Sequence, residues 1–380
     1  MPRLVAIDLP GGNDFVDEVR RAWDRGDAVL PVDHRLPDVA KDAVVRAMRP
    51  HVVVDLDGRR NLSDGIDTEI DDALVIATSG STGQPKGVVH TMRGLEASAR
   101  STSTALGTLE SDSWLACLPL AHIGGFSVVA RALIMGLALE VHDGFDADRV
   151  GESECTLTSL VPTALRRLDP SRFRRILLGG SRPPADRPHN CVATYGLTET
   201  GSGVVYDGWP NPDVELRILD DEILVRGPML MRAYRDGTTT IDANGWLHTD
   251  DVGRLTSDGR LEVEGRRGDV INTGGQKVWP DAVEKVLQRL LPDVDLVIVS
   301  RPDPEWGERV VLVHTGGAPD LATCRSMVKE SLAAYCAPTD IVAVTELPRT
   351  SSGKVRRDVD RKSTRLNSTH LSVSRMPSSA

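Results

Sequence analysis

The sequence lacks several features that would point to common classes of protein. Lys and Arg (45) are fewer than Asp and Glu (55), and the net charge of −10 disfavours binding to nucleic acid or to an anionic membrane. No run of about 18 apolar residues and no signal peptide is present, so we expect no integral membrane association. The five cysteines contain no C-x-x-C pair and predict buried free thiols in a reducing cytoplasm: Cys117, Cys155, Cys191, Cys324 and Cys336.

The phosphate-binding P-loop motif is also missing. The segment TSGSTGQPKGVVH (78–90) resembles it in composition, but Pro85 stands where the motif requires glycine, and Lys86 is followed by Gly87. A kinase or a P-loop ATPase is therefore disfavoured.

The same segment nevertheless has the chemistry of a polyphosphate site. An apolar run at 73–77 predicts a strand before it, and residues 92–107 have the composition of a helix. A turn rich in Gly, Ser and Thr between a strand and a helix offers backbone N–H groups and hydroxyls to anionic oxygens, and Lys86 adds a positive charge. The alternative is a flexible surface loop in which the lysine is incidental.

The pattern along the 380 residues predicts an α/β fold with two domains. Residues 1–266 alternate strand-like and helix-like stretches and end in a β-rich subdomain with hairpins at 214–227 and 253–266. Residues 267–360 predict a smaller, mobile α+β C-terminal domain with helices at 281–291 and 321–335. Residues 361–380 contain four basic residues and no acidic one, which predicts a disordered or non-native tail or, alternatively, a basic interaction tail.

Five segments rich in small, polar and charged residues follow one another along the chain: TSGSTGQPKG (78–87), ATYGLTET (193–200), GWLHTDDVG (245–253), GRRGDVINTGGQKVWPDAVE (265–284) and LPRTSSGKVRR (347–357). Together they resemble the adenylate-forming superfamily of acyl-CoA ligases, luciferases and nonribosomal adenylation domains. The resemblance implies an enzyme that activates a small-molecule carboxylic acid with ATP and Mg²⁺ and then transfers the acyl group, with coenzyme A as cosubstrate.

The resemblance also implies a set of nucleotide-binding residues. Tyr195 would offer a flat face to adenine, Thr198 a hydroxyl to phosphate, and Glu199 a carboxylate to Mg²⁺. An ordinary strand-to-turn segment is the alternative. Asp251 matches the carboxylate that accepts the ribose hydroxyls, although the family usually has glycine where this chain has Asp250. The full ATP-binding set is Thr78, Ser79, Gly80, Ser81, Thr82, Gly83, Lys86, Gly180, Tyr195, Gly196, Thr198, Asp251 and Arg266.

Residues of the C-terminal segments receive the remaining roles by the same resemblance. Lys354 matches the catalytic lysine that bridges the substrate carboxylate and the α-phosphate, and Asp269 matches the hinge between the domains. Gly274 and Gly275 match a turn that lines the CoA tunnel. A surface lysine and a plain tight turn are the alternatives.

The acid pocket is expected around PLAHIGGF (119–126) and LLGGSRPP (177–184). His122 would serve as a catalytic and substrate-binding residue, unless it is an ordinary core histidine, and Gly124, Gly125 and Ser181 would line the substrate. Arg131 and Arg182 are weaker candidates for binding a second carboxylate of the acid.

The early position of Thr78, together with PLAHIGGF, resembles the o-succinylbenzoate–CoA ligases of menaquinone biosynthesis. Another aryl- or acyl-CoA ligase, a stand-alone adenylation enzyme and a non-catalytic nucleotide-binding paralogue are the alternatives. A homodimer stays open.

Overall fold

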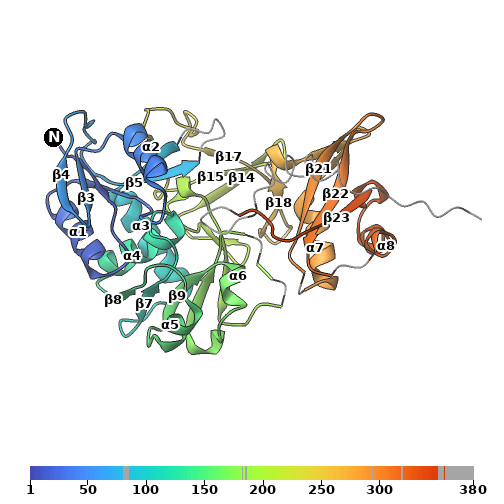
Figure 1. Ribbon diagram of the computed structural model, residues 1–380, viewed down its shortest axis with the longest axis horizontal. Helices are drawn as coiled ribbons and strands as arrows, with labels where there is room; N and C mark the ends of the chain where they lie inside the picture. The colour runs from blue at the N-terminus through green and yellow to red at the C-terminus, as the bar shows by residue number, and fades with distance from the viewer. Residues whose placement is uncertain are drawn as a thin grey trace, which may run out of the picture. The chain divides into compact units, whose positions relative to one another are not determined.

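The structure of the protein is a computed structural model that describes residues 1–79, 85–181, 183–184, 186–292, 294–317, 320–349 and 355. Its contacts divide the chain into two compact units (Figure 1). The large unit contains Met1–Thr249 and Arg254–Glu262, and the small unit contains Asp250–Gly253 and the chain from Val263 onward.

The large unit is built on two seven-stranded sheets. The first has the order β16-β6-β5-β2-β1-β3-β4, with β1 (Leu4–Ile7), β2 (Ala28–Pro31), β3 (Val52–Asp55), β4 (Gly58–Asn61), β5 (Asp72–Ser79), β6 (Pro85–Thr91) and β16 (Ala233–Tyr234). The second has the order β13-β12-β11-β10-β9-β7-β8, with β7 (Ser113–Ala116), β8 (Ala138–Val141), β9 (Leu157–Leu160), β10 (Arg175–Leu178), β11 (Cys191–Tyr195), β12 (Val205–Tyr206) and β13 (Trp209–Pro210).

Helices cover both faces of each sheet, because the central parallel strands are apolar on both sides. One core cluster joins the two sheets through α1 (Asn13–Asp24), α3 (Met92–Leu106) and α4 (Ile123–Met135). The outer face of the first sheet packs on α2 (Asp38–Met48). The outer face of the second packs on α5 (Ala147–Glu152) and α6 (Pro162–Leu165). This layering is the predicted α/β fold.

A third sheet has the order β14-β15-β17-β18 and corresponds to the predicted β-rich region: β14 (Glu215–Leu219), β15 (Glu222–Arg226), β17 (Leu247–Leu255) and β18 (Leu261–Arg266). Asp220 and Asp221 both have positive φ (49° and 68°) between β14 and β15. Positive φ at both central residues is the signature of a type I′ hairpin, so the predicted Asp-Asp turn is confirmed.

The small unit is the predicted α+β structure. Its five-stranded sheet has the order β20-β19-β22-β21, with β23 paired to β22. The strands are β19 (Ile271–Thr273), β20 (Gln276–Val278), β21 (Leu296–Asp303), β22 (Gly307–Thr315) and β23 (Asp340–Val344). The described part of this unit also contains the helices α7 (Pro280–Leu290) and α8 (Leu321–Ser331). Its separate core includes Val283, Leu287, Ile298, Leu312 and Val328.

One local prediction was wrong. The loop after Ser79 leads into a second strand, β6, which pairs antiparallel with β5 in the register Thr78↔Lys86. The helix predicted at 92–107 is present as α3, which begins at Met92, where the Thr91 hydroxyl accepts a hydrogen bond from the Gly94 N–H at 3.0 Å. The β-branched pair Val88-Val89 favours a strand, so the loop joins two strands instead of a strand and a helix.

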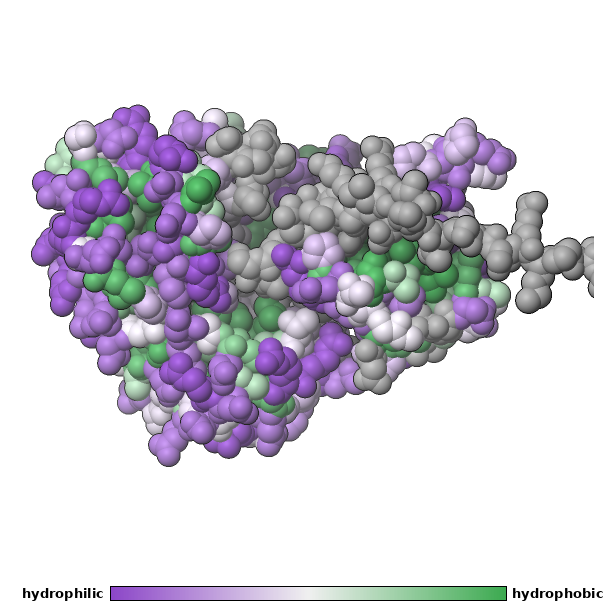
Figure 2. Space-filling model, in the orientation of Figure 1, coloured by the Kyte–Doolittle hydropathy of each residue, from purple (hydrophilic) through white to green (hydrophobic). Residues whose placement is uncertain are grey.

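The surface of the large unit seen in Figure 2 is mainly hydrophilic, with scattered apolar patches. Within the described residues, no helix combines the length and the apolar character that crossing a bilayer requires. All five cysteines lie in the described part of the chain and are free thiols.

The start of α4 provides a test of this packing with two adjacent glycines. A Cβ on Gly125 would lie 2.3 Å from the Pro119 carbonyl oxygen, whereas a Cβ on Gly124 would meet nothing nearer than 3.8 Å. We expect Gly125→Ala to lower the free energy of unfolding by about 1 to 3 kcal/mol. Gly124→Ala should raise it by roughly 0.5 to 1 kcal/mol, since alanine favours helix. Urea unfolding measures both, and equal effects would contradict the packing described.

Candidate nucleotide and acid site

The predicted site segments of the large unit follow parallel strands of its second sheet. Strands β7, β9, β10 and β11 are parallel, so their carboxyl ends lie at one edge. The segment leading to His122 follows β7, Gly180 and Ser181 follow β10, and Gly196 follows β11. Ligands of open α/β sheets bind outside such an edge. The sheet therefore brings together segments predicted separately for ATP and for the acid.

Two close approaches fix this edge. A Cβ on Gly179 would lie 2.8 Å from the Thr194 hydroxyl, which places the turn after β10 against β11. A Cβ on Gly196 would lie 2.2 Å from the Ser202 carbonyl oxygen. Any larger residue at position 196 would require the Ser202 backbone to move. Gly196 is therefore needed for the fold of the turn that carries Thr198 and Glu199.

Lys86 and Glu199 are joined through a tyrosine that the sequence analysis did not select. The Lys86 ammonium lies 5.1 Å from the centroid of the Tyr234 ring, a cation–π contact. The Tyr234 hydroxyl donates a hydrogen bond to Glu199 Oε1 at 2.9 Å. Lys86, predicted to bind phosphate, and Glu199, predicted to bind the metal, thus contact different parts of the same Tyr234 side chain.

His90 holds the backbone of the same turn. Its Nε2 lies 2.8 Å from the Thr198 carbonyl oxygen, and because a carbonyl only accepts, this nitrogen carries the proton. The His90 side chain is fully buried, and no described residue forms a hydrogen bond with its Nδ1. Burial lowers the pKa of His90 to about 4, although the bond to Thr198 acts in the opposite direction. The imidazole is therefore neutral at physiological pH.

Arg131 of α4 is a buried cation that contacts Ser202, the residue against which Gly196 packs. Its residue exposure is 1%, its guanidinium lies 4.7 Å from the centroid of the Trp114 ring, and Nη2 donates to the Ser202 hydroxyl at 3.1 Å. Nε and Nη1 are buried and have no hydrogen-bond partner in the part of the chain that the structure describes. Burial lowers the pKa of Arg131 to about 10, while the nearby Tyr206 hydroxyl raises it.

Three of the residues predicted to line the acid, His122, Gly124 and Gly125, are at the start of α4, and Ser181 follows β10. His122 is the N-cap of that helix, and its amide donates to the Pro119 carbonyl. Burial raises the pKa of Asp33, but bonds from Arg35 and the charge of His122 outweigh it, and the pKa lies below its usual range. His122 is therefore near an acidic side chain, Asp33, from the turn that follows β2. Gly125 is required by the chain's own packing, and Gly124 and Ser181 are exposed.

The predicted residues of the small unit lie on strands and turns of that unit. Asp251 is on β17, beside Asp250, whose φ of 59° is in the left-handed region that favours glycine and that aspartate tolerates better than most residues. Arg266 is exposed at the end of β18, and Asp269 ends the short helix that follows.

Gly274 and Gly275 form the predicted tight turn, between β19 and β20, with φ of 55° and 76°. A Cβ on Gly274 would lie 2.5 Å from the Trp306 ring. The turn therefore needs glycine at this position both for its conformation and for the space beside Trp306.

Several predicted residues lie outside the described part of the chain: Gly80, Ser81, Thr82, Gly83, Arg182, Lys354 and the segment 361–380. Ser79 is described only as the last residue of β5. The Thr78 hydroxyl donates to the Lys86 carbonyl oxygen at 3.3 Å, within the β5–β6 hairpin.

Glu199 fits the requirements of Mg²⁺ bound together with ATP. Among the described residues, only its Oε1 takes part in a hydrogen bond, and a single carboxylate is enough where phosphates supply other ligands. Among the described residues, no group of three or more His, Cys, Asp or Glu side chains is arranged to hold a metal ion by itself. The donor set thus fits a metal that arrives with the nucleotide.

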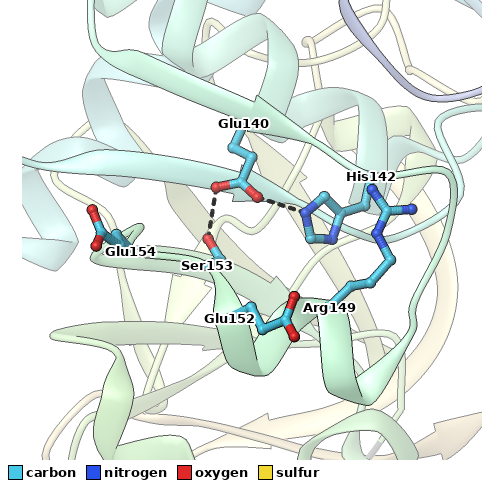
Figure 3. A pocket seen from close by; sticks show the side chains of 6 residues that line it. All are labelled: Glu140, His142, Arg149, Glu152, Ser153 and Glu154. Carbon is cyan, nitrogen blue, oxygen red and sulfur yellow. Dashed lines mark hydrogen bonds and ion pairs between the residues drawn. The ribbon is translucent and has the colours of Figure 1, made fainter.

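A polar hollow of about 370 Å³ lies elsewhere in the large unit (Figure 3), lined by Glu140, His142, Arg149, Glu152, Ser153 and Glu154. Glu140, His142 and Ser153 point toward one another. The carboxylate lies 2.6 Å from His142 Nε2 and accepts from the Ser153 hydroxyl at 2.8 Å. None of the predicted site residues lines this hollow.

Comparisons with known proteins agree with the fold. The AMP-binding enzyme family matches residues 22–235, and its AMP-binding enzyme C-terminal domain matches residues 282–354. The chain is 35% identical to the 2-succinylbenzoate–CoA ligase of Geobacillus kaustophilus, over 76% of this chain and 69% of that protein. It is 32% identical to the ligase of the same name from Enterococcus faecalis, over 75% and 68%.

Solved structures give the same result. The o-succinylbenzoate CoA synthetase of Bacillus subtilis in complex with its acyl-adenylate intermediate is 27% identical and has a TM-score of 0.82, covering 94% of this chain and 87% of that chain. The complex of the same enzyme with ATP and magnesium ion has a TM-score of 0.81 at 28% identity, covering 94% and 88%. The chain therefore belongs to the AMP-binding enzyme family, the adenylate-forming enzymes that its motifs predicted.

The buried His90 predicts a specific dependence of stability on pH. Its pKa is about 4 in the folded chain and about 6.5 when unfolded, so the unfolded state binds the extra proton between these values. His90 should therefore make the protein about 2 kcal/mol less stable at pH 5 than at pH 7.5, with little further loss from this group below pH 4.

Denaturant unfolding at both pH values of the wild type and of His90→Gln measures this contribution. Glutamine keeps an N–H donor for the Thr198 carbonyl but does not titrate, so the difference between the two pH values should shrink in the variant. An unchanged difference would contradict a neutral buried His90.

Proposed function

We propose that the protein is an ATP-dependent acid–CoA ligase that converts o-succinylbenzoate into o-succinylbenzoyl-CoA through an acyl-adenylate, a step of menaquinone biosynthesis. Membership of the AMP-binding enzyme family supports the reaction, and the similarity to ligases named for 2-succinylbenzoate supports the acid. The structural observation that carries the choice of acid is the buried Arg131.

Arg131 favours an acid that keeps a negative charge during the reaction. A buried guanidinium costs several kcal/mol unless a counter-ion and hydrogen bonds compensate for its lost hydration. Among the described residues no carboxylate pairs with Arg131, and two of its nitrogens lack partners. The carboxylate of a monocarboxylic acid is consumed when the adenylate forms. o-Succinylbenzoate has a second carboxylate, on its aromatic ring, which can pair with Arg131 throughout.

The reaction has two balanced steps. The succinyl carboxylate attacks the α-phosphorus of ATP and pyrophosphate leaves, which forms the acyl-adenylate. The CoA thiolate then attacks the acyl carbonyl, and AMP leaves as the carbon–oxygen bond breaks. Because a thiol with a pKa of about 8.5 is only slightly ionised at neutral pH, its placement beside the activated carbonyl supplies much of the rate.

We assign the residues of this chain to the steps as follows. The loop at 78–83 and Lys86 hold the β- and γ-phosphates, and Thr198 adds a hydroxyl. Gly180, Tyr195 and Gly196 lie beside adenine, and Asp251 and Arg266 bind the ribose and phosphate. Glu199 is the protein ligand of Mg²⁺, which neutralises charge on the phosphates when it is bound.

The remaining assignments concern the acid, CoA and the change between the two steps. His122, Gly124, Gly125 and Ser181 lie beside the acid, and Gly274 and Gly275 beside CoA. Lys354 stabilises the charge that develops as the adenylate forms. Asp269 is the hinge between a domain of residues 1–266 and one of residues 267–360, and its rotation exchanges Lys354 for the CoA-binding turn.

Two further expectations belong to this proposal. A cytoplasmic location agrees with the five free thiols, since disulfides are rare where glutathione keeps thiols reduced. Size-exclusion chromatography with light scattering measures whether the protein forms a homodimer.

The first prediction concerns the acid. We expect ATP- and CoA-dependent consumption of o-succinylbenzoate with release of AMP and pyrophosphate, and little turnover of benzoate or a medium-chain fatty acid. Turnover of another acid alone would keep the ligase and reject the substrate. ATP binding without AMP from any acid would favour a non-catalytic nucleotide-binding protein.

The second prediction concerns Arg131. Arg131→Met replaces a buried ion by an apolar side chain of similar length, so the stability of the protein should be unchanged or higher. The KM for o-succinylbenzoate should nevertheless rise roughly ten- to a hundredfold, the value of a lost charged hydrogen bond, while the KM for ATP stays the same. Equal changes in both KM values would contradict a role in binding the acid.

The third prediction separates the two half-reactions. Lys354→Ala should lower adenylate formation, measured by pyrophosphate exchange, by a factor on the order of a hundred or more. Thioester formation from a preformed adenylate should be largely unaffected. Lys329→Ala, which removes an exposed lysine of α8, is the matched control. Equal loss in both half-reactions would reject the assignment.

A further inference from the structure

Tyr234 occupies a position between the two charged residues of the proposed phosphate and metal site. The ring face, which is negative, lies under the Lys86 ammonium at 5.1 Å, and the hydroxyl proton is donated to Glu199 Oε1 at 2.9 Å. In the described structure Lys86 and Glu199 form no ion pair with each other. Tyr234 instead contacts both charges through different parts of its side chain.

The backbone pairing of β16 with β6 fixes the position of Tyr234 along β6. Tyr234 is opposite Val88 in the antiparallel pair, and the Arg235 amide donates to the Gly87 carbonyl at 2.7 Å. Because directly opposite residues share a face, Tyr234 lies on the same face of the sheet as Lys86, Val88 and His90. The chain just before β16 also binds the metal-site turn, since the Met231 amide donates to the Glu199 carbonyl at 2.7 Å.

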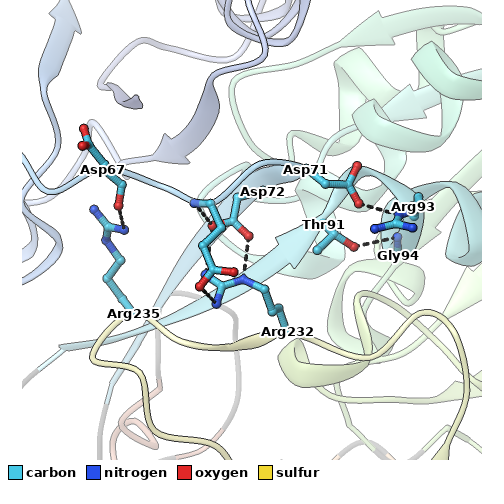
Figure 4. A network of polar contacts seen from close by, with 9 residues as sticks. Asp67, Asp71, Asp72, Thr91, Arg93, Gly94, Arg232 and Arg235 are labelled. Carbon is cyan, nitrogen blue, oxygen red and sulfur yellow. Dashed lines mark hydrogen bonds and ion pairs between the residues drawn. The ribbon is translucent and has the colours of Figure 1, made fainter. Parts of the chain in front are cut away.

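Arg232 and Arg235, the residues directly before and after β16 in the sequence, hold this short strand in place (Figure 4). Arg232 binds both oxygens of Asp72, whose side chain is fully buried, at 2.8 and 2.9 Å. Arg235 donates to the backbone carbonyls of Met48, Ile66 and Asp67. A two-residue edge strand would otherwise be weakly held, so these contacts restrict the movement of Tyr234.

We propose that Tyr234 is a positioning residue that keeps Lys86 and Glu199 apart and oriented before ATP and Mg²⁺ bind; this rests on the proposed function. A lysine and a glutamate within reach of each other would pair, and ATP would have to break that pair. The ring gives the ammonium a neutral partner, which leaves its protons available to phosphate. The hydroxyl occupies one glutamate oxygen and leaves Oε2 for the metal.

The two parts of Tyr234 can be tested separately. Tyr234→Phe keeps the ring under Lys86 and removes the bond to Glu199, whereas Tyr234→Leu removes both contacts. Isothermal titration calorimetry of ATP binding, with and without Mg²⁺, reports on the site without turnover. We expect Tyr234→Phe to keep the affinity for metal-free ATP and to lose about three- to tenfold of the gain that Mg²⁺ provides. Tyr234→Leu should weaken binding under both conditions.

A double-mutant cycle shows whether Tyr234 acts through Glu199. If it does, Tyr234→Phe should have no further effect on the Mg²⁺ gain in a Glu199→Gln background. Additive effects would overturn the proposal. Tyr335→Phe, which removes the hydroxyl of an exposed tyrosine in the small unit, is the matched control and should leave both affinities unchanged.

Other outcomes separate this proposal from the proposed function. If the wild type forms AMP from o-succinylbenzoate and binds ATP more tightly with Mg²⁺, but Tyr234→Phe behaves identically, only the role of Tyr234 is rejected. If Tyr234→Phe lowers the urea midpoint but not the Mg²⁺ gain, Tyr234 has only a structural role. If the wild type shows neither AMP formation nor an effect of Mg²⁺, the proposed function itself fails.

Discussion

The antiparallel pairing of β5 with β6 is the interaction on which the rest of the candidate nucleotide site depends. It returns the chain after the Gly/Ser/Thr-rich loop and places Lys86 directly opposite Thr78. It also sets which side chains of β6 face the turn that carries Thr198, because alternate residues of a strand share a face. A slip of one residue would turn Lys86 and His90 to the opposite face of the sheet.

Strand β6 also organises the segments beside it. Its outer edge pairs with β16 and so brings Tyr234 to Lys86, and His90 on the same face of β6 binds the Thr198 carbonyl. These contacts join β6 to two segments that lie more than a hundred residues further along the chain. The hairpin is therefore the part of the large unit that converts separate motifs into one site.

Two buried basic side chains near this site have opposite consequences. His90 avoids the cost of a buried charge by staying neutral, and its one N–H is used by the Thr198 carbonyl. Arg131 stays charged at neutral pH, because its pKa is lowered only to about 10, and two of its nitrogens have no hydrogen-bond partner among the described residues. The first residue stabilises the fold as it stands. The second lacks a counter-ion within the described part of the chain, which is why it carries the proposed choice of acid.

The sequence by itself determined the features that depend on neighbours along the chain. The turn at Asp220-Asp221, the two-unit α/β and α+β order and the family follow from local composition and motifs, and the structure and comparisons confirm them. Strand β6 was missed because Gly, Pro and Lys dominate the start of its segment and hide the Val88-Val89 pair.

Only the tertiary structure decided which distant residues meet. Tyr234 was not selected, since one tyrosine between arginines carries no motif, and its partners lie 148 and 35 residues away. Arg131 was only a weak candidate, because an arginine in a helix is usually exposed, and nothing local predicts its burial against Trp114. Local patterns set turns and strand tendencies through short-range sterics, whereas the pairing of sheets and the burial of charge depend on the whole fold.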